Sequence, residues 1–223
     1  MTFDFDLDGA IFDMDGTLLD SMGYWRFVSL EYILLHRLPL RQEALARMYR
    51  TPATRMLTEY SEQEGLELRR GELLPELEEL MSRHYLLDVK PKGTAAAFTA
   101  ALQARGVRMC VATSTSRVYA CSALRRQGML ERFAFVSDDM DMPGRKSDPA
   151  FFRAIAQRLG VTPERCWVFE DALYAIRAAK RAGFRVCAVE DGTQQDDRAQ
   201  IQACADVYIR DYQELTHAEE RSV

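Results

Sequence analysis

Two aspartates that follow a short apolar run, Asp13 and Asp15, are the residues of this sequence best suited to chemistry. The run Ala10-Ile11-Phe12 is typical of a buried strand in a parallel sheet, and Gly16 suits the turn that follows. Open α/β sheets bind ligands outside the carboxyl ends of their strands, so we expect Asp13 to face a ligand. Two carboxylates this close repel each other unless a cation holds them, and an oxygen-only site favours Mg²⁺.

A similar segment upstream, Asp6-Leu7-Asp8-Gly9-Ala10, competes with this interpretation. It lacks the threonine that follows Gly16, and the residues before it are not uniformly apolar, as a buried strand would require. A solvated acidic turn is the alternative for either segment. We therefore favour Asp13 and Asp15 as the functional pair.

Polar residues also follow three later segments of the chain. Strand 107–112 leads into Thr113-Ser114-Thr115-Ser116, hydroxyl groups at a helix start that suit a phosphate or serve as a plain helix cap. Lys146, one of only four lysines, follows the loop 138–144, although an isolated lysine is more often a solvated surface residue. Strand 166–169 leads into Glu170-Asp171, which suits either a cap or a site.

Taken together, these groups favour phosphoryl transfer assisted by Mg²⁺. Four segments that meet at one sheet edge would supply two acidic pairs, hydroxyl groups and one ammonium group. In such a site one carboxylate attacks phosphorus, a second handles the proton of the leaving group, and cations neutralise the phosphate oxygens.

The elements that must position these residues form an α/β pattern. From residue 94 onward helices 94–105, 117–127, 149–159 and 172–182 alternate with strands 107–112, 133–137, 166–169 and 185–189, and a last strand, 206–209, leads into an acidic tail. Such alternation predicts a Rossmann-like parallel sheet with helices on both faces. Residues 20–89 contain no convincing strand, so we predict an inserted all-helical cap domain there and a core made of residues 1–19 and 90–223.

Composition narrows the possible partners. The 223 residues are 48% apolar, which supports a globular core, and the net charge of −5 disfavours binding to nucleic acid. No stretch is long and apolar enough for a membrane span, and the N-terminus lacks the pattern of a signal peptide. The five cysteines include no Cys-x-x-Cys pair and are interpreted as buried apolar residues. We expect a cytoplasmic protein without a membrane anchor.

The four segments, in this order, resemble the four motifs of the haloacid dehalogenase-like superfamily, in the subgroup with a helical cap after the first motif that includes β-phosphoglucomutases and many small phosphatases. The resemblance implies an aspartate nucleophile at Asp13 and a general acid/base at Asp15. It also implies phosphate binding by Thr113, with Ser114 beside it, and a charge-balancing lysine at Lys146.

The resemblance further implies a Mg²⁺ site and a substrate-contacting cap. Asp13, the backbone carbonyl of Asp15, Glu170 and Asp171 would hold the metal, and Arg55 matches a cap arginine of β-phosphoglucomutase. The sequence departs from the pattern at Ser147-Asp148, between the lysine and its usual proline, and at Ala172 and Ala175, where Ser and Gly are frequent. These departures change what we expect of the way the substrate is positioned more than what we expect of the reaction type.

The resulting hypothesis is a Mg²⁺-dependent phosphatase acting on a small phosphorylated metabolite, such as a sugar phosphate or a nucleotide. A phosphomutase is the second candidate, although Trp25 stands where the mutase has a cap histidine. A catalytically idle binding module of the same fold is the third. The leaving group and the oligomeric state stay open at this point.

Overall fold

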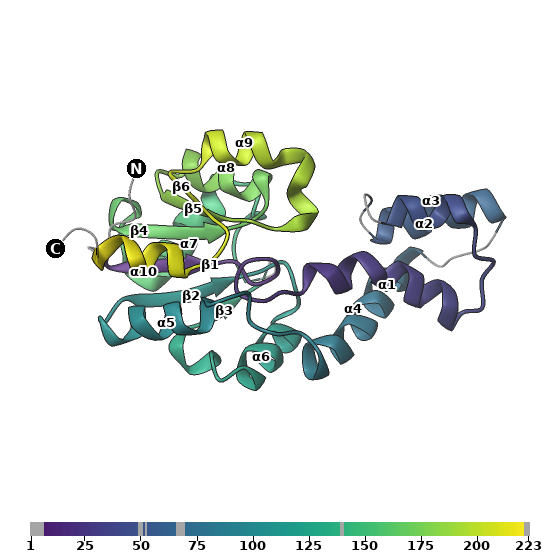
Figure 1. Cartoon of the computed structure of the whole chain (residues 1–223), viewed down its shortest axis with the longest axis horizontal. Helices are drawn as coiled ribbons and strands as arrows, with labels where there is room; N and C mark the ends of the chain where they lie inside the picture. The colour runs from purple at the N-terminus through teal and green to yellow at the C-terminus, as the bar shows by residue number, and fades with distance from the viewer. Residues whose placement is uncertain (1–6, 49–50, 52, 66–69, 139–140, 221–223) are drawn as a thin grey trace. The chain divides into compact units, whose positions relative to one another are not determined.

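A computed structural model of the chain describes residues 7–48, 51, 53–65, 70–138 and 141–220 (Figure 1). Its contacts divide the chain into two units, Ser21–Val89 and the remainder. We call the first the helical unit and the second the sheet unit. None of the helices in the described ranges is long and apolar enough to cross a membrane.

The described part of the sheet unit contains one parallel sheet with the strand order β3-β2-β1-β4-β5-β6. The strands are β1 (Gly9–Phe12), β2 (Arg108–Ala112), β3 (Val136–Ser137), β4 (Cys166–Glu170), β5 (Arg185–Val189) and β6 (Val207–Ile209). The helices of this unit are α5 (Ala95–Ala104), α6 (Arg117–Arg126), α7 (Pro149–Leu159), α8 (Leu173–Arg181), α9 (Arg198–Cys204) and α10 (Gln213–Glu220). The predicted Rossmann-like parallel sheet with helices on both faces is confirmed (Figure 1).

Successive residues of the central strand face opposite sides of the sheet, because side chains alternate along a strand. Ile11 belongs to a buried cluster formed with α7, α8 and α9. Phe12 instead stacks on Phe169 with ring centroids 4.4 Å apart, and both rings pack against Phe98 of α5. Burying each such aromatic side chain contributes roughly 1.5–3 kcal/mol, so both faces anchor β1 in the middle of the core.

The helical unit contains α1 (Met22–Leu35), α2 (Gln42–Met48), α3 (Ala53–Glu64) and α4 (Arg70–Leu87). Helices α1 and α4 pack together through polar as well as apolar contacts. The indole Nε1 of Trp25 donates to the Tyr85 hydroxyl at 2.9 Å, and the rings of Tyr24 and His84 lie 4.7 Å apart. Trp25 therefore contributes to the packing inside this unit.

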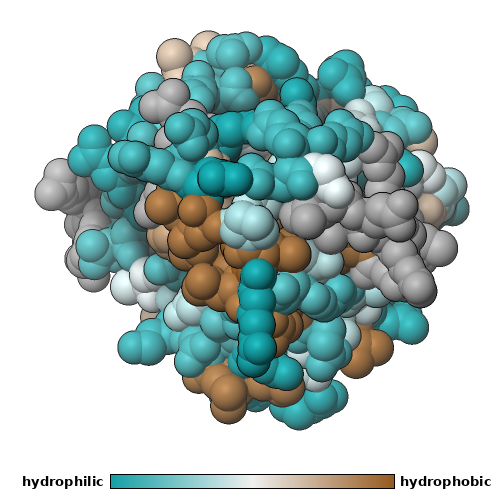
Figure 2. All heavy atoms as spheres, turned by 90° about the vertical axis from the view of Figure 1, so that its right-hand side faces the viewer, coloured by the Kyte–Doolittle hydropathy of each residue, from teal (hydrophilic) through white to brown (hydrophobic). Residues whose placement is uncertain are grey.

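The helical spacing of apolar residues predicts the buried faces of α1 and α4 only in part. Val28 and Tyr32 are buried, as are Leu77 and Leu80, but Leu35 and Leu87 are 57% and 72% exposed. Both are the last residue of their helix, and spacing alone does not indicate where the packing partner of a helix ends. Other exposed apolar side chains of this unit include Phe27, Leu34, Leu40 and Leu74, and Figure 2 shows a patch of apolar side chains among hydrophilic ones on one face of the molecule.

One boundary of the predicted secondary structure is wrong. The predicted strand 133–137 is shortened to Val136–Ser137, because a 3₁₀ turn over Leu130–Arg132 continues into a hydrogen bond from the Phe133 N–H to the Leu130 carbonyl. The acidic tail after the last strand contains a helix, α10, that was not predicted from the sequence.

Helix α10 forms because its start is both capped and buried. Asp211 accepts a hydrogen bond from the Gln213 N–H at 2.9 Å, while Tyr212 and Leu215 are 1% and 3% exposed. Asp211 also accepts from the Thr94 N–H at 3.1 Å and from the Thr94 hydroxyl, which joins α10 to the start of α5. A charged composition therefore did not prevent this segment from packing.

The junction between Gly93 and Asp211 provides a test of this packing. Gly93 has a φ of 48°, and a Cβ there would overlap the Asp211 carboxylate. We expect Gly93→Ala to lower the free energy of unfolding by about 2–4 kcal/mol, since the left-handed backbone and lost hydrogen bonds both contribute. Gly106→Ala is the matched control, because Gly106 has a φ of 76° with open space around it, and should cost only about 1–2 kcal/mol. Urea unfolding measures both values, and equal losses would contradict the role of Asp211.

Candidate active site

The register of the central strands decides which side chains lie beside Asp13. Phe12 is paired with Phe169 of β4, so Asp13 and Glu170, the next residues, lie level with each other. The Asp13 N–H donates to the Phe169 carbonyl at 2.9 Å, which continues the ladder to the end of both strands. Because the strands are parallel, their carboxyl ends meet at one edge, and the two carboxylates are neighbours there.

Lys146 lies between these two carboxylates. Its Nζ is 2.5 Å from Asp13 Oδ1 and 2.7 Å from Glu170 Oε2, and its side chain is only 3% exposed. Lys146 lies within a turn in which the Asp148 N–H donates to the Arg145 carbonyl at 2.7 Å, and Asp148 then caps α7. The isolated lysine is therefore a buried partner of two acids and not a solvated surface residue.

Glu170 serves both as a helix-start acceptor and as a member of the charged cluster. Its Oε1 accepts from the N–H groups of Asp171 and Ala172 at 3.2 and 3.1 Å, just before α8 begins, whereas Oε2 faces Lys146. Asp171 is also buried, with 3% exposure. The sequence left open whether this acidic pair caps a helix or belongs to a functional site. The Glu170 side chain does the first with one oxygen and lies in the charged cluster with the other.

The buried cluster has more acidic than basic groups. Burial, together with the charge of Glu170, raises the pKa of Asp13 to about 8, although Lys146 acts in the opposite direction. Burial also raises the pKa of Asp171 well above its usual value, and the charges of Glu170 and Asp13 add to this effect. Burial alone would lower the pKa of Lys146, but Asp13 and Glu170 outweigh it and hold that pKa well above its ordinary value.

These carboxylates fit a divalent cation. Asp13, Glu170 and Asp171 each place a carboxylate oxygen within 4.8 Å of the other two. Asp13 Oδ2 is buried and has no hydrogen-bond partner, so this carboxylate oxygen is available as a ligand for a cation. A hard cation that takes oxygen ligands, such as Mg²⁺, would satisfy this atom and offset the excess negative charge.

Asp15 and the hydroxyl groups after β2 form a second part of the site. Thr113 is fully buried, and its Oγ1 accepts from the Thr115 N–H at 3.0 Å. The Thr115 hydroxyl donates to Asp15 Oδ2 at 2.7 Å, whereas Ser114 is exposed. The structure therefore brings together Asp15 and this hydroxyl cluster, and no side chain of the cluster is needed to cap α6: its N-cap residue, Ser116, makes no side-chain capping bond.

Arg55 lies in the other unit of the chain. Its side chain is 74% exposed and its Nε donates to Glu59 Oε1 at 2.8 Å, one helical turn away. Glu59 also pairs with Arg47. Arg55 thus carries a charge on a solvated helix surface, and the pairing with Glu59 limits its rotamers.

Two further residues near the cluster were not singled out in the sequence. Asp191 lies two residues after β5, is 7% exposed, and pairs with Lys92. Its charge contributes to the raised pKa of Asp171. The rule that ligands gather at strand ends would have indicated Asp191, but the pairing with Lys92 brings together residues 99 positions apart and has no signal in the sequence.

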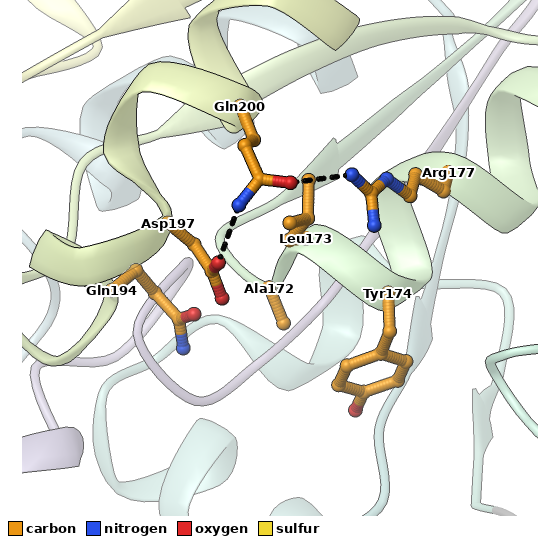
Figure 3. A pocket seen from close by; sticks show the side chains of 7 residues that line it. All are labelled: Ala172, Leu173, Tyr174, Arg177, Gln194, Asp197 and Gln200. Carbon is orange, nitrogen blue, oxygen red and sulfur yellow. Dashed lines mark hydrogen bonds between the residues drawn. The ribbon is translucent and has the colours of Figure 1, made fainter. Parts of the chain in front are cut away.

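A cavity of about 330 Å³ lies beside the start of α8 (Figure 3). It is lined by Ala172, Leu173, Tyr174, Arg177, Gln194, Asp197 and Gln200. Arg177 donates to Gln200 Oε1 at 2.7 Å and Gln200 donates to Asp197 Oδ1 at 3.1 Å, as the dashed lines show. The buried acids are not part of this lining, but Ala172, whose N–H donates to Glu170, is, so the cavity lies next to the charged cluster.

Comparison with known proteins shows which family this chain resembles. A sequence model of haloacid dehalogenase-like hydrolases matches residues 7–183. The fructose-1-phosphate phosphatase YqaB of Escherichia coli strain K12 is 30% identical, with 78% of this chain and 92% of the relative covered. The validoxylamine A 7′-phosphate phosphatase of Streptomyces hygroscopicus subsp. limoneus is also 30% identical, with 92% and 94% covered.

Solved structures show the same fold at lower identity. CbbY of Rhodobacter sphaeroides, in complex with phosphate, has a TM-score of 0.75 and 22% identity, with 94% of this chain and 96% of that chain covered. A Thermotoga maritima structure assigned to β-phosphoglucomutase has a TM-score of 0.80 and 23% identity, with 96% and 99% covered. At these identities the likeness establishes the arrangement of strands and helices alone.

The acidic cluster predicts a pH-dependent response to Mg²⁺. Without metal, the raised pKa of Asp13 means that the folded state binds a proton more tightly than the unfolded state, so this contribution to stability is lost as the pH rises from about 4 through about 8. Mg²⁺ at 100 times its Kd stabilises a folded protein by about 2.7 kcal/mol. We therefore expect Mg²⁺ to raise the melting temperature by about 5–10 °C at pH 8 and by much less at pH 5, where protons compete for the carboxylates.

Scanning calorimetry with and without Mg²⁺ measures this difference. Asp171→Asn should reduce the shift at pH 8. Asp8→Asn, which changes a half-exposed carboxylate paired with Arg165, is the matched control and should leave the shift unchanged. An equal shift at both pH values would contradict binding at the buried cluster.

Proposed function

Because this chain belongs to the haloacid dehalogenase-like hydrolase family, we propose that it is a Mg²⁺-dependent phosphatase that hydrolyses a small phosphorylated metabolite through an aspartyl-phosphate on Asp13. Its relatives are phosphatases, and the chain is a hydrolase of phosphoric monoesters. The observation that carries the proposed mechanism is the position of Lys146, buried between Asp13 and Glu170 at 2.5 and 2.7 Å.

In the first step, a carboxylate oxygen of Asp13 attacks phosphorus in line with the leaving alcohol. Lys146 contacts Asp13 Oδ1 and keeps the carboxylate oriented while its positive charge offsets that of the phosphate oxygens. Thr113 and Ser114, at the end of β2, supply donors for the same phosphate. Asp15 gives its proton to the departing oxygen.

In the second step, water hydrolyses the aspartyl-phosphate. Asp15, now ionised, takes a proton from the water as it attacks, which restores the protonated Asp15 and the free Asp13 carboxylate. Asp13, Glu170, Asp171 and the Asp15 carbonyl would hold Mg²⁺. When bound, this ion neutralises charge on the transferring phosphate group and positions it.

We propose a sugar phosphate or a nucleotide-like metabolite as the substrate class. The relatives named above act, by their names, on fructose 1-phosphate and on validoxylamine A 7′-phosphate, and the sugar of the first supports a hydroxylated leaving group. We further propose that residues 20–89 form a cap that contacts this leaving group. The unpaired thiols of the described cysteines are in keeping with a reducing compartment such as the cytoplasm.

Phosphate release from a substrate panel tests the proposed function. The panel contains sugar phosphates, nucleotides and p-nitrophenyl phosphate, each with and without Mg²⁺, and β-glucose 1-phosphate with its bisphosphate activator. We expect metal-dependent release from several members and no release above background by Asp13→Asn, which keeps the shape of the side chain but removes the nucleophile. Arg165→Gln, which changes a half-exposed side chain paired with Asp8, is the control and should retain activity.

Other outcomes of the panel would favour the alternatives. Isomerisation of β-glucose 1-phosphate without release would indicate a phosphomutase, whereas silence with every substrate would favour a catalytically idle module. Release by Asp13→Asn at the rate of the unchanged protein would remove Asp13 from the nucleophile role.

Arg55 is the residue of the helical unit that we propose for substrate binding. If its guanidinium contacts the leaving group, Arg55→Gln should raise KM for the best sugar phosphate roughly three- to tenfold and leave kcat within about twofold, since it would remove binding shared by substrate and transition state. Arg41→Gln is the matched control, because Arg41 also pairs with a glutamate, Glu64, at 3.0 Å in the same unit. Equal effects of the two substitutions would contradict a specific role for Arg55.

A further inference from the structure

The hydroxyl groups after β2 do not all face the same partner. The Thr113 oxygen accepts a backbone hydrogen bond from Thr115 at 3.0 Å, which folds the loop back on itself. The Thr115 hydroxyl instead donates to Asp15 Oδ2 at 2.7 Å. This second bond joins the loops after β1 and β2, which are 100 residues apart in the chain.

The donor in this bond is held in place before it meets Asp15. Thr115 is 7% exposed, its backbone N–H is engaged by Thr113, and the Thr113 N–H in turn donates to the Ser137 carbonyl of β3 at 3.0 Å. A threonine side chain also has few χ1 rotamers, because its Cβ is branched. The hydroxyl therefore approaches the carboxylate from a rigid strand end.

The 2.7 Å distance between the Thr115 hydroxyl and Asp15 Oδ2 is that of a well-formed hydrogen bond. Such a bond restricts the rotamers of the Asp15 carboxyl group, and a proton transfer requires a carboxyl oxygen to lie within hydrogen-bond reach of the reacting atom. If the carboxyl group is already fixed in one orientation, the reaction step does not have to include a change of its rotamer.

From these contacts we infer that Thr115 is a positioning residue for Asp15, and that its hydroxyl orients the carboxyl group that exchanges a proton with the leaving alcohol. The inference rests on the proposed function, in which Asp15 is the acid/base. It separates two roles within one hydroxyl cluster: Thr113 serves the phosphate, and Thr115 serves the group that protonates the leaving oxygen.

Leaving groups of different basicity distinguish these roles. An alkyl phosphate needs a proton on its departing oxygen, whereas p-nitrophenyl phosphate releases a stable phenolate and needs little help from an acid. The quantity to measure is kcat/KM for both esters, because it covers the steps up to formation of the aspartyl-phosphate and excludes the hydrolysis step that both esters share.

We expect Thr115→Val, which removes the hydroxyl at nearly constant shape, to lower kcat/KM for the best alkyl ester about 10- to 100-fold and for p-nitrophenyl phosphate by less than about threefold. Thr115→Ser keeps the hydroxyl and should restore most of the alkyl activity. Thr113→Val should lower both values alike, since both esters carry the same phosphate.

Thr115→Ala provides a second variant if Thr115→Val does not fold, because it removes the same hydroxyl with a smaller side chain. A similar loss for both esters in the Thr115 variants would overturn the inference and indicate phosphate binding or a general structural role. Unchanged kcat/KM for both esters would also overturn it. If the unchanged protein hydrolyses no phosphate ester of the panel, including these two, the proposed function itself fails, and the inference fails with it.

Discussion

The structure depends on one electrostatic constraint, a buried ammonium group that contacts two buried carboxylates. Charges leave water only when they are paired, and an unpaired buried charge costs several kcal/mol. Lys146 meets this condition with Asp13 and Glu170, both at the ends of central strands. Asp171 adds a third acid that the described ion pairs do not neutralise, so the cluster as a whole has a deficit of positive charge.

Contacts around the cluster hold the loops that carry it. The Tyr212 hydroxyl donates to the Thr17 carbonyl at 3.2 Å and so connects the loop after β1 to the C-terminal part of the sheet unit. The Asp20 N–H donates to the Lys90 carbonyl at 2.9 Å, which joins the two points where the chain leaves and re-enters this unit. Lys92, just beyond, pairs with Asp191 at the end of β5. The return of the chain from the helical unit is therefore anchored next to the strand ends that carry the acids.

The loop after β1 carries two carboxylates, Asp13 and Asp15, in different surroundings. Asp13 and Asp15 are two residues apart, yet they face different neighbours. Burial, together with the charge of Glu170, raises the pKa of Asp13 to about 8 without metal, whereas Asp15 accepts a hydrogen bond from the Thr115 hydroxyl of the loop after β2. Gly16, with a φ of 84°, permits the turn that follows Asp15. The proposed roles, a nucleophile and an acid/base, call for such distinct surroundings, and a bound cation would favour the ionised form of Asp13.

Much of the architecture follows from the sequence alone, because it depends on local patterns. The apolar run before Asp13 and the alternation of helices and strands after residue 94 predicted the parallel sheet and its connections. Glu170 and Asp171 could be proposed as site residues because they follow a strand. The tertiary structure decided what depends on distant contacts: the burial of Lys146, the dual role of Glu170, the pairing of Lys92 with Asp191, the bond from Thr115 to Asp15, and the helix at the C-terminal end. Sequence patterns report the preference of a segment for a conformation, whereas partners, burial and charge balance arise only when the fold brings residues 99 to 133 positions apart to within hydrogen-bond distance.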